Sequence, residues 1–533
     1  MNKIVFLFLF FIHFCSCTRL QSTDNIIIER DCKATTLSSL YISIGQEMLD
    51  SIHHSQKVKV FADAFWHTAD SDTIYEGDLI IKTRGNSTFL GAKKPYSITF
   101  PFRQQLFNLY EDKSYALLSN SLDRICHMSN ALAFDLAYAI GLPAPKYTFV
   151  HLLINDEYKG IYQLTNKIEI DHKLLPICDL GRENKWLNHF SQSSYTNFSQ
   201  IGSHGKIYRK GIKLDTNPED ITGGYLLDHT CAVQQYDKDP SGFISNAGEM
   251  IRIREPKYAS KEEVDYISDF YNQMECAVYS KDGFNPVSQK HYSQYIDIRS
   301  FAKYYIIQEL LQHVDAGANS FMMYKDADET DSLLYAGPIW DFDLFVPMSS
   351  NSGIHRIYAG AKIGGRNDSL SGGLLYHLLK HEDFQSIVRE EYFCDVLPAV
   401  NRLLENNYFD SLQALIDVDS EEMSAYLRER SDFLSWLWKS DTTDVVCVQV
   451  INSSQYERAI SIFGTKTSGV RLPLYPVVYN HDPVLTWHLA GNSTPLPYDT
   501  VFYTNQQVEM HFREPTPYEV QIRRIKKKLR KMF

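Results

Sequence analysis

The chain has 533 residues, 44% of them hydrophobic and 22% charged, which is long enough for about two to four domains with cores of their own. The aromatic content of 34 Tyr, 30 Phe and 6 Trp argues against extensive disorder. The formal net charge of −12 argues against nucleic acid binding across the whole surface, because such binding depends on cationic side chains against phosphates. We therefore expect a folded protein with no nucleic-acid partner.

The first residues are typical of a secretory signal. Lys3 precedes an apolar run over residues 4–12 that is too short to span a bilayer, and small residues follow it up to Cys17. The last four residues, Phe-Cys-Ser-Cys, are similar to a bacterial lipoprotein signal, although Phe14 stands where leucine is commonest. We favour a lipoprotein signal over residues 1–17 with lipidation at Cys17. The alternative is a cleaved signal that releases a free protein.

Lipidation would attach the protein to a membrane of the bacterial cell envelope, outside the cytoplasm. Residues 18–37 then form a polar linker between the anchor and the fold. Seven cysteines follow the signal and none forms a C-x-x-C pair, so a structural zinc site has no support. An odd, scattered set also fits poorly with a disulfide framework, and we expect most of these cysteines to be buried.

Alternating apolar residues, many of them β-branched or aromatic, predict a series of strands after the linker. The segments are LYISI, KVKVFADAFW, GDLIIKTRG and YSITFPF. Residues 129–141 predict a helix capped by Ser129 or Asn130. Residues 146–170 then predict a β-hairpin with its turn at residues 155–157.

The rest of the chain divides into three parts. Further strands are predicted within residues 222–258, and helical patterns dominate residues 260–439 apart from a loop region at 315–365. Short strands and proline-rich turns then predict a separate β-domain over residues 445–515. Residues 516–533 form a basic tail.

Basic residues make up seven of the nine residues in the tail segment RRIKKKLRK. Blocks of like charge usually repel and stay extended, which predicts a solvated end. The alternative is a second, electrostatic contact with an anionic membrane surface, worth about 1 kcal/mol per basic residue.

The segment GPIWDFDLF places Asp341 and Asp343 two apart in an otherwise apolar run. Burying ionised carboxylates among apolar residues is costly unless a cation compensates them. On a strand, residues two apart project to the same side, so both carboxylates would converge on one metal ion. The alternative is that these residues form a turn or cap a helix through backbone N–H groups.

Several segments, taken in order, resemble the CotH kinase family over roughly residues 38–440. An ordered series of this kind is more specific than any single motif. The segments are IKTRGNSTFLGAKKPYSITF, YALLSNSLDRICHMSNALAFDLAYAIGL, LINDEYKGIYQLTNKIEI, GGYLLD and YYIIQELLQHVDAGANSFMMYKDAD, followed by GPIWDFD.

The resemblance implies an α+β chain with an atypical protein-kinase-like fold, followed by the small C-terminal all-β domain. It implies transfer of phosphate from ATP, with Mg²⁺, to hydroxyl groups of a protein. Such chemistry needs cations near the phosphates, metal ions on their oxygens and a carboxylate that orients the attacking hydroxyl. No sequence feature identifies the protein substrate.

The resemblance also implies roles for particular residues. Asp315 matches the catalytic carboxylate, and Asp341 and Asp343 fall at the Mg²⁺ position, where Asn319 or Ser320 would add an oxygen ligand. The implied ATP-binding residues are Arg84, Lys93 and Lys94. Lys94 is the preferred phosphate contact of the two lysines, because it is in phase with the residues of the strand YSITF. A solvated lysine at a strand edge is the alternative.

Two positions depart from the family pattern. Ser129 stands where an Arg usually precedes Asn130, and Asn166 stands where the family usually has Glu, which could pair with the strand lysine. These losses keep open a second function, a catalytically inactive pseudokinase that serves as a binding or structural envelope lipoprotein. A third function, glycan hydrolysis by paired carboxylates, rests only on isolated acidic residues.

Overall fold

The computed structural model describes most of the chain after residue 36, and the described residues all belong to one compact unit, Thr35–Phe533. The predicted signal with Cys17, nearly all of the linker and the basic segment 523–531 lie outside the described residues. Those described are 37–121, 123, 127–189, 196–201, 207–313, 315, 317, 319–344, 356–357, 373–416, 420–439, 445–450, 461–472, 484–497, 500–513, 516–517 and 521.

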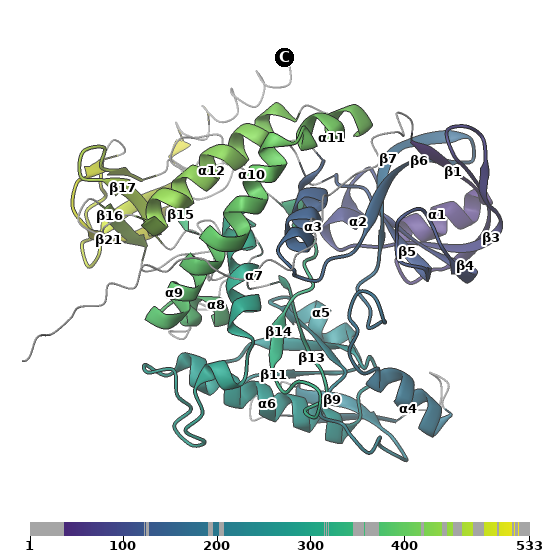
Figure 1. The fold of residues 1–533 in the computed structure, drawn as a ribbon, viewed down its shortest axis with the longest axis horizontal. Coiled ribbons are helices and arrows are strands. Elements are labelled where there is room, and N and C mark those ends of the chain that lie inside the picture. Colours follow the sequence, from purple (N-terminus) through teal and green to yellow (C-terminus); the bar gives the residue numbers. More distant parts are fainter. Residues whose placement is uncertain are drawn as a thin grey trace, which may run out of the picture. The chain divides into compact units, whose positions relative to one another are not determined.

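Seven strands near the N-terminus close into a barrel in the order β1-β2-β3-β4-β5-β7-β6 (Figure 1). Neighbouring strands are antiparallel, except that β1 pairs with β6 in parallel. The strands are β1 (Ser38–Ser43), β2 (Val60–His67), β3 (Thr73–Thr83), β4 (Tyr96–Gln104), β5 (Asp112–Leu118), β6 (Tyr147–Ile154) and β7 (Glu157–Asn166).

The alternation that predicted these strands also fills the barrel. On β2, Ala64 and Trp66 point into the core, whereas Phe61 and Phe65 are exposed on the outside. Helix α1 (Gln46–His54) adds Leu49 to the same core. Because side chains of a strand alternate between the two faces, a closed barrel buries one face of every strand.

The predicted hairpin is confirmed as β6 and β7, with the turn at Asn155 and Asp156. Both turn residues have positive φ, 52° and 63°, as a tight turn that matches the strand twist requires. The Asn155 side chain also accepts from and donates to the backbone of Ile44, at 2.9 and 2.8 Å. These two hydrogen bonds hold the β6–β7 turn against the end of strand β1.

The predicted helix after the barrel strands is confirmed as α3 (Ser129–Ala139), but its cap is a different residue. Neither Ser129 nor Asn130 is the N-cap. The carboxylate of Asp123 accepts hydrogen bonds from the backbone N–H and the hydroxyl of Ser129, at 2.9 and 2.7 Å. A residue six positions upstream therefore accepts from a backbone N–H at the helix start, which lacks a partner within the helix.

A second antiparallel sheet of seven strands follows, in the order β14-β13-β10-β12-β11-β9-β8. Its strands β10, β12 and β13 share one large core with helices α3, α6 and α7. The strands are β8 (Thr196–Ile201), β9 (Ile207–Lys213), β10 (Tyr225–Thr230), β11 (Gly242–Ile244), β12 (Met250–Glu255), β13 (Asn319–Lys325) and β14 (Leu334–Ala336).

Helices α6 to α12 confirm the helical pattern predicted for residues 260–439. Together with the barrel and the second sheet, the helices confirm an α+β architecture. The helices are α2 (Ser87–Leu90), α4 (Leu180–Asn188), α5 (Val233–Lys238), α6 (Lys261–Tyr279), α7 (Ile298–Leu310), α8 (Gly373–Leu378), α9 (Glu382–Glu391), α10 (Leu397–Glu405), α11 (Tyr408–Ile416) and α12 (Glu421–Lys439).

Asp341 and Asp343 lie outside any strand, so the strand geometry considered from the sequence does not hold. After β14 the chain turns at Gly337, with φ 115°, and Asp341 itself has φ 69°. A single 3₁₀ turn, η2 (Phe342–Leu344), follows. A φ of 69° lies in the left-handed region rather than the extended one, so a turn rather than strand alternation sets the directions of the two carboxylates.

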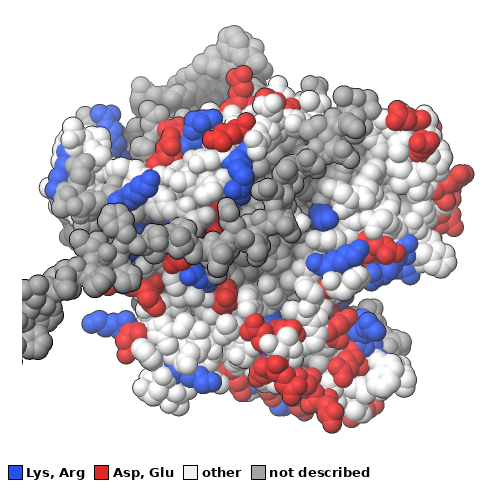
Figure 2. All heavy atoms as spheres, viewed as in Figure 1, with Lys and Arg blue, Asp and Glu red and all other residues white. Residues whose placement is uncertain are grey.

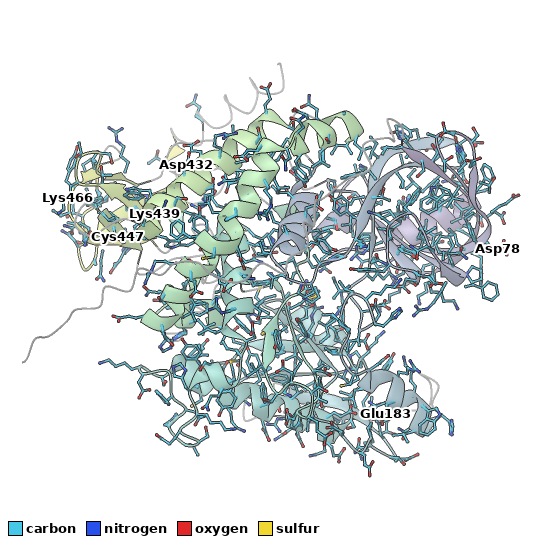
Figure 3. The ribbon with its side chains drawn as sticks, in the orientation of Figure 1. Asp78, Glu183, Asp432, Lys439, Cys447 and Lys466 are labelled. Carbon is cyan, nitrogen blue, oxygen red and sulfur yellow. The ribbon has the colours of Figure 1, made fainter. Side chains whose placement is uncertain are left out.

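The C-terminal region forms a five-stranded sheet, in the order β15-β17-β16-β21-β19, and a strand pair, β18-β20. Lys439 ends α12, and Cys447 lies on the first of the C-terminal strands (Figure 3). The sheet has a small core of its own and also takes in the short strand β15 from the region predicted as a loop. The strands are β15 (Arg356–Ile357), β16 (Val445–Val450), β17 (Ser461–Thr465), β18 (Val470–Arg471), β19 (Val484–Leu489), β20 (Val501–Phe502) and β21 (Gln506–Arg513).

Burial of the cysteines was expected, and the expectation is wrong for those described. Cys178, Cys276 and Cys394 are exposed, and Cys231 and Cys447 are half-buried. They lie at loops, at the solvent side of helices or in the small C-terminal sheet rather than within the large cores. None of the helices among the described residues has both the length and the apolar character needed to cross a bilayer.

A buried ion pair fixes the end of α7 to α12. The side chains of Arg430 and Glu309 are both fully buried, with Nη2 and Oε2 3.0 Å apart. The guanidinium also donates to the Glu309 carbonyl oxygen through Nε and Nη2, at 3.0 and 2.8 Å. Carbonyl groups at a helix end lack partners within the helix, so the arginine satisfies both the acid and the helix terminus.

We predict that Arg430→Met lowers the free energy of unfolding by about 3–5 kcal/mol, because it leaves the Glu309 carboxylate buried without a counter-charge. The double variant Arg430→Met/Glu309→Met should recover most of this loss. Urea unfolding followed by circular dichroism measures both. Lys261→Met, which removes an exposed pair with Asp265 on α6, is the control and should stay close to wild type. Equal stability of Arg430→Met and this control would contradict the prediction.

Candidate active site

Asp341 and Asp343 line a pocket whose walls come from several distant parts of the chain. It contains about 360 Å³ of empty space, part of it open to solvent. The barrel contributes the residues after β3 and at the end of β5, and the second half of the chain contributes Trp340 and the two aspartates. The full lining is Arg84, Gly85, Thr88, Pro95, Leu118, Ser119, Asn120, Asn130, Trp340, Asp341 and Asp343.

Three carboxylates lie within electrostatic range of one another in this region, and the pKa values of Asp341 and Asp343 are both raised. Desolvation, followed by repulsion from Asp341 and Asp315, raises the pKa of Asp343 to about 8. The pKa of Asp341 is raised by desolvation and by the charge of Asp315, although the Ser320 hydroxyl donates to its carboxylate at 3.0 Å. Asp343 is only 7% exposed, whereas Asp341 faces solvent from within the concave surface. Such a group of acids attracts a cation.

Arg84 is the cationic side chain nearest this group in the lining of the pocket. Its guanidinium lies over the ring of Trp340, 5.1 Å from the ring centre. The Trp340 ring in turn stacks on Phe134 of α3, with the ring centres 5.9 Å apart. Burial lowers the pKa of Arg84, and the charges of Asp341 and Asp343 oppose that shift. An arginine remains charged in spite of such shifts, so the stack presents a fixed positive charge at the pocket.

A chain of buried amides positions the segment that carries the two aspartates. Asn120 donates to the Gln163 side chain at 2.9 Å and accepts from Asn130 at 3.1 Å. Asn130 then accepts a hydrogen bond from the backbone N–H of Phe342, at 2.8 Å. The Phe342 N–H lies between Asp341 and Asp343 in the chain, so this relay fixes the turn to the barrel and to α3. The three amide side chains are all at most 5% exposed.

Asp315 follows α7 as the resemblance implied, and it lies within electrostatic range of both aspartates. The residue before it in the described chain, His313, is buried. Its Nδ1–H donates to the amide oxygen of Gln308 at 2.9 Å, and its ring stacks on Phe342 with the ring centres 4.4 Å apart. The end of α7 and the turn of the two aspartates therefore touch directly. This contact is how the chain brings Asp315 to the other two acids.

Asn319, implied as an oxygen ligand, is placed differently from Ser320. Its side-chain oxygen accepts from the backbone N–H of Cys231 at 3.1 Å and contacts the hydroxyl of Thr230 at 3.3 Å. Ser320 instead donates to Asp341. Of the two oxygen ligands weighed from the sequence, Ser320 is the one whose hydroxyl meets a candidate metal-binding carboxylate.

Neither of the predicted ATP-binding lysines contacts the aspartates. Lys93 donates to the Ile161 carbonyl oxygen at 2.5 Å and lies over the ring of Tyr162. Lys94 donates to the Phe89 carbonyl oxygen at 2.6 Å. Burial lowers the pKa of Lys93 to about 8. Both lysines precede β4 rather than belonging to it, so the strand phase that favoured Lys94 does not apply.

The two departures from the family pattern have structural roles. Asn166 is buried, and its side chain bonds to the backbone of Tyr110. It accepts from the Tyr110 N–H at 3.0 Å and donates to the Tyr110 carbonyl oxygen at 2.8 Å. Ser129 binds Asp123, as described above. Asp123 and Asn120 were missed from the sequence, because a single buried Asp or Asn in a loop has no periodic signal. The structure shows that Asn120 supports the turn at Asp343 through Asn130, whereas the charge of Asp123 adds to the raised pKa of Asp343.

The site suits a magnesium ion that is completed by a ligand. No three acidic, histidine or cysteine side chains among the residues searched, those that the structure describes, gather closely enough to hold a metal on their own. Mg²⁺ in phosphate-transfer sites typically takes one or two carboxylates together with water and substrate phosphates. Among the described residues, no side chain donates a hydrogen bond to the Asp343 carboxylate, so a buried acid is left for a cation. The donor set therefore fits Mg²⁺ with a phosphate.

Acidic and basic side chains both occur on the face of the molecule that Figure 2 presents, with acidic ones grouped over its lower part. The local electrostatics of the pocket, rather than a broad charged surface, therefore distinguish this site.

No protein with a curated description matches the chain. Among solved structures, it is similar to a chain of the Shewanella oneidensis MR-1 toxin–antitoxin complex of HipA, HipB and operator DNA, at 11% identity and a TM-score of 0.27, covering 75% of this chain and 70% of that one. The family model described as CotH kinase protein matches residues 81–417, more than half of the chain. The chain belongs to the CotH kinase family.

Proposed function

We propose that the protein is an ATP- and Mg²⁺-dependent kinase with a protein-kinase-like fold that transfers phosphate to protein hydroxyl groups. The convergence of Asp315, Asp341 and Asp343 beside Arg84 supports this function best. Desolvated acids that raise one another's pKa are unfavourable without a cation, and phosphoryl transfer uses such acids with a bound metal and a fixed positive charge. Family membership supports the same chemistry.

Each residue has a distinct role in this proposal. Asp341 and Asp343 would hold Mg²⁺, which when bound neutralises charge on the transferring phosphate. Arg84, fixed over Trp340, would hold phosphate oxygens in the pocket. Asp315 would orient the acceptor hydroxyl and take its proton as the new P–O bond forms. Lys93 and Lys94 stay proposed ATP contacts, and each would have to leave a carbonyl partner to reach phosphate.

A second function, that of an inactive pseudokinase used for binding, has one specific observation in its favour. Asn166 stands where a Glu could pair with a lysine, and its amide is fully engaged with Tyr110. Neither Lys93 nor Lys94 has a carboxylate partner among the described residues. The Lys–Glu pair on which ordinary kinases depend is therefore not formed by these residues.

The proposed location is the bacterial cell envelope, with a lipid anchor on Cys17. The signal-like residues before that cysteine support it, and it gives the protein a membrane partner outside the cytoplasm.

The first test separates the two functions. We predict that Asp343→Asn weakens Mg²⁺-dependent ATP binding by about tenfold or more, equivalent to about 1.4 kcal/mol, because it removes a charged ligand. Asp315→Asn should leave that binding close to wild type and lower phosphate transfer to casein by about 10²–10⁴-fold. Calorimetry with ATP and Mg²⁺ and transfer of labelled phosphate measure the two effects.

The matched control is Asp156→Asn in the β6–β7 turn, where Asn tolerates the positive φ equally well. It should bind and transfer like wild type. Binding without transfer in the wild type would favour the pseudokinase, and an absence of Mg²⁺-dependent ATP binding would contradict both the site and the kinase function.

The second test concerns location. We expect Cys17→Ala to move the protein out of the membrane fraction of a bacterial host or to leave its signal uncleaved, because no thiol remains to be lipidated. Cys15→Ala is the matched control and should stay in the membrane. Fractionation and mass spectrometry of the N-terminal peptide measure this, and a wild-type protein that is soluble and carries no acyl chain would refute the anchor.

A further inference from the structure

The end of strand β10 holds the segment that carries Asp315 through side-chain hydrogen bonds. The Nδ1 atom of His229 lies 2.8 Å from the carbonyl oxygen of Gly317. The backbone N–H of Cys231 donates to the side chain of Asn319 at 3.1 Å. The backbone N–H of Asn319 in turn donates to the carbonyl oxygen of Asp315, also at 3.1 Å. These hydrogen bonds thus connect the end of strand β10 with Asp315, Gly317 and Asn319.

Both ring nitrogens of His229 face acceptors. The Gly317 carbonyl oxygen can only accept, so Nδ1 must carry a proton to bond to it. Nε2 forms an ion pair with Oε2 of Glu249, which directly precedes β12. An ionised carboxylate can also only accept, so Nε2 must carry a proton as well. A neutral imidazole has a single N–H and cannot make both bonds.

The charged groups around the ring favour this imidazolium. Burial lowers the pKa of His229, but the Glu249 carboxylate, the Gly317 carbonyl and the charge of Asp228 outweigh it, so the pKa is raised. Asp228, on the same strand, is itself paired with Arg252 of β12.

Helices α6 and α8 carry the other titratable groups discussed near the His229 ring. From α6, Glu275 accepts from Ser245 at 2.6 Å, and desolvation raises its pKa to about 7. Tyr279, also on α6, stacks at 3.7 Å on His377 of α8. Burial lowers the pKa of His377 to about 4, so that ring is neutral near pH 7. Ionisation of Glu275 adds negative charge near His229 and reinforces its protonation.

We propose that His229 is a positioning residue for the segment that carries Asp315, and that this segment loosens when the ring loses one of its two protons. The kinetic consequence rests on the proposed kinase function. Because the pKa of His229 is raised, the doubly protonated ring is complete at low pH and is lost as pH rises through that value. Phosphate transfer should therefore decline on the alkaline side, while Mg²⁺-dependent ATP binding at Asp341 and Asp343 should not follow it.

The first measurement needs no activity. Hydrogen exchange of the peptide that spans residues 315–321 should be faster in His229→Gln than in wild type at pH 6.5, because the bond to Gly317 is weakened. The matched control, His151→Gln, changes a histidine that bonds to Tyr158 on the barrel wall and should leave this peptide unchanged. If His229→Gln does not fold, Glu249→Gln, which keeps the ring, should show the same faster exchange at pH 8.

The second measurement is the pH profile of phosphate transfer to casein. In Glu249→Gln the alkaline decline should move to lower pH by about one unit or more, since removal of an opposite charge at this range shifts a pKa by that much. In His229→Gln the decline should disappear, with kcat lowered and the KM for ATP unchanged. A residue with a merely structural role would lower activity equally at every pH.

The outcomes separate this inference from the proposed function. A wild-type protein that transfers no phosphate contradicts the kinase, and the exchange experiment still decides the role of His229. Unchanged exchange in the variants that fold, or an alkaline decline that Glu249→Gln leaves in place, overturns the inference.

Discussion

Repulsion among three acids is the constraint on which the candidate site depends. Asp315, Asp341 and Asp343 would separate if the chain allowed it, because each raises the cost of ionising its neighbours. They stay together because rigid parts of the fold hold the segments on either side. The relay through Asn120 and Asn130 holds the turn, and the strand end at β10 holds the loop. A site of this kind stores unfavourable electrostatic energy that a bound cation releases.

The supports come from parts of the chain that are far apart in sequence. The buried pair of Arg430 and Glu309 fixes the end of α7 from α12, and α7 leads directly to His313, which stacks on Phe342. The barrel adds Arg84 from the end of β3. Because Arg430, Glu309 and His313 are themselves buried and hydrogen-bonded, the acids are positioned by packing rather than by one another.

The sequence predicted local elements well where one periodic signal governs them. Alternation identified the barrel strands other than β5, and the turn at Asn155 and Asp156 followed from residues that tolerate positive φ. The directions of Asp341 and Asp343 could not be predicted in this way, because Gly337 and Asp341 turn the backbone where strand alternation does not apply. The positions of Asp315 and Asp343 in a shared site came from resemblance. The supporting residues Asn120 and His229 had no signal, since contacts between distant segments leave no local pattern.

The replacement of a Glu by Asn166 bears on whether the site is active. An unpaired acid at this buried position would need a cation, whereas the amide is satisfied by the Tyr110 backbone in both directions. The buried amide therefore needs no counter-charge. Because Asn166 offers no carboxylate, Lys93 and Lys94 donate to carbonyl oxygens instead. The positive charge that phosphate transfer needs at the pocket then falls to Arg84, which remains charged at any physiological pH and is already stacked beside the acids. Loss of the lysine–glutamate pair thus removes one means of holding phosphate, and Arg84 remains as a second. The replacement by Asn166 alone therefore does not make the protein inactive.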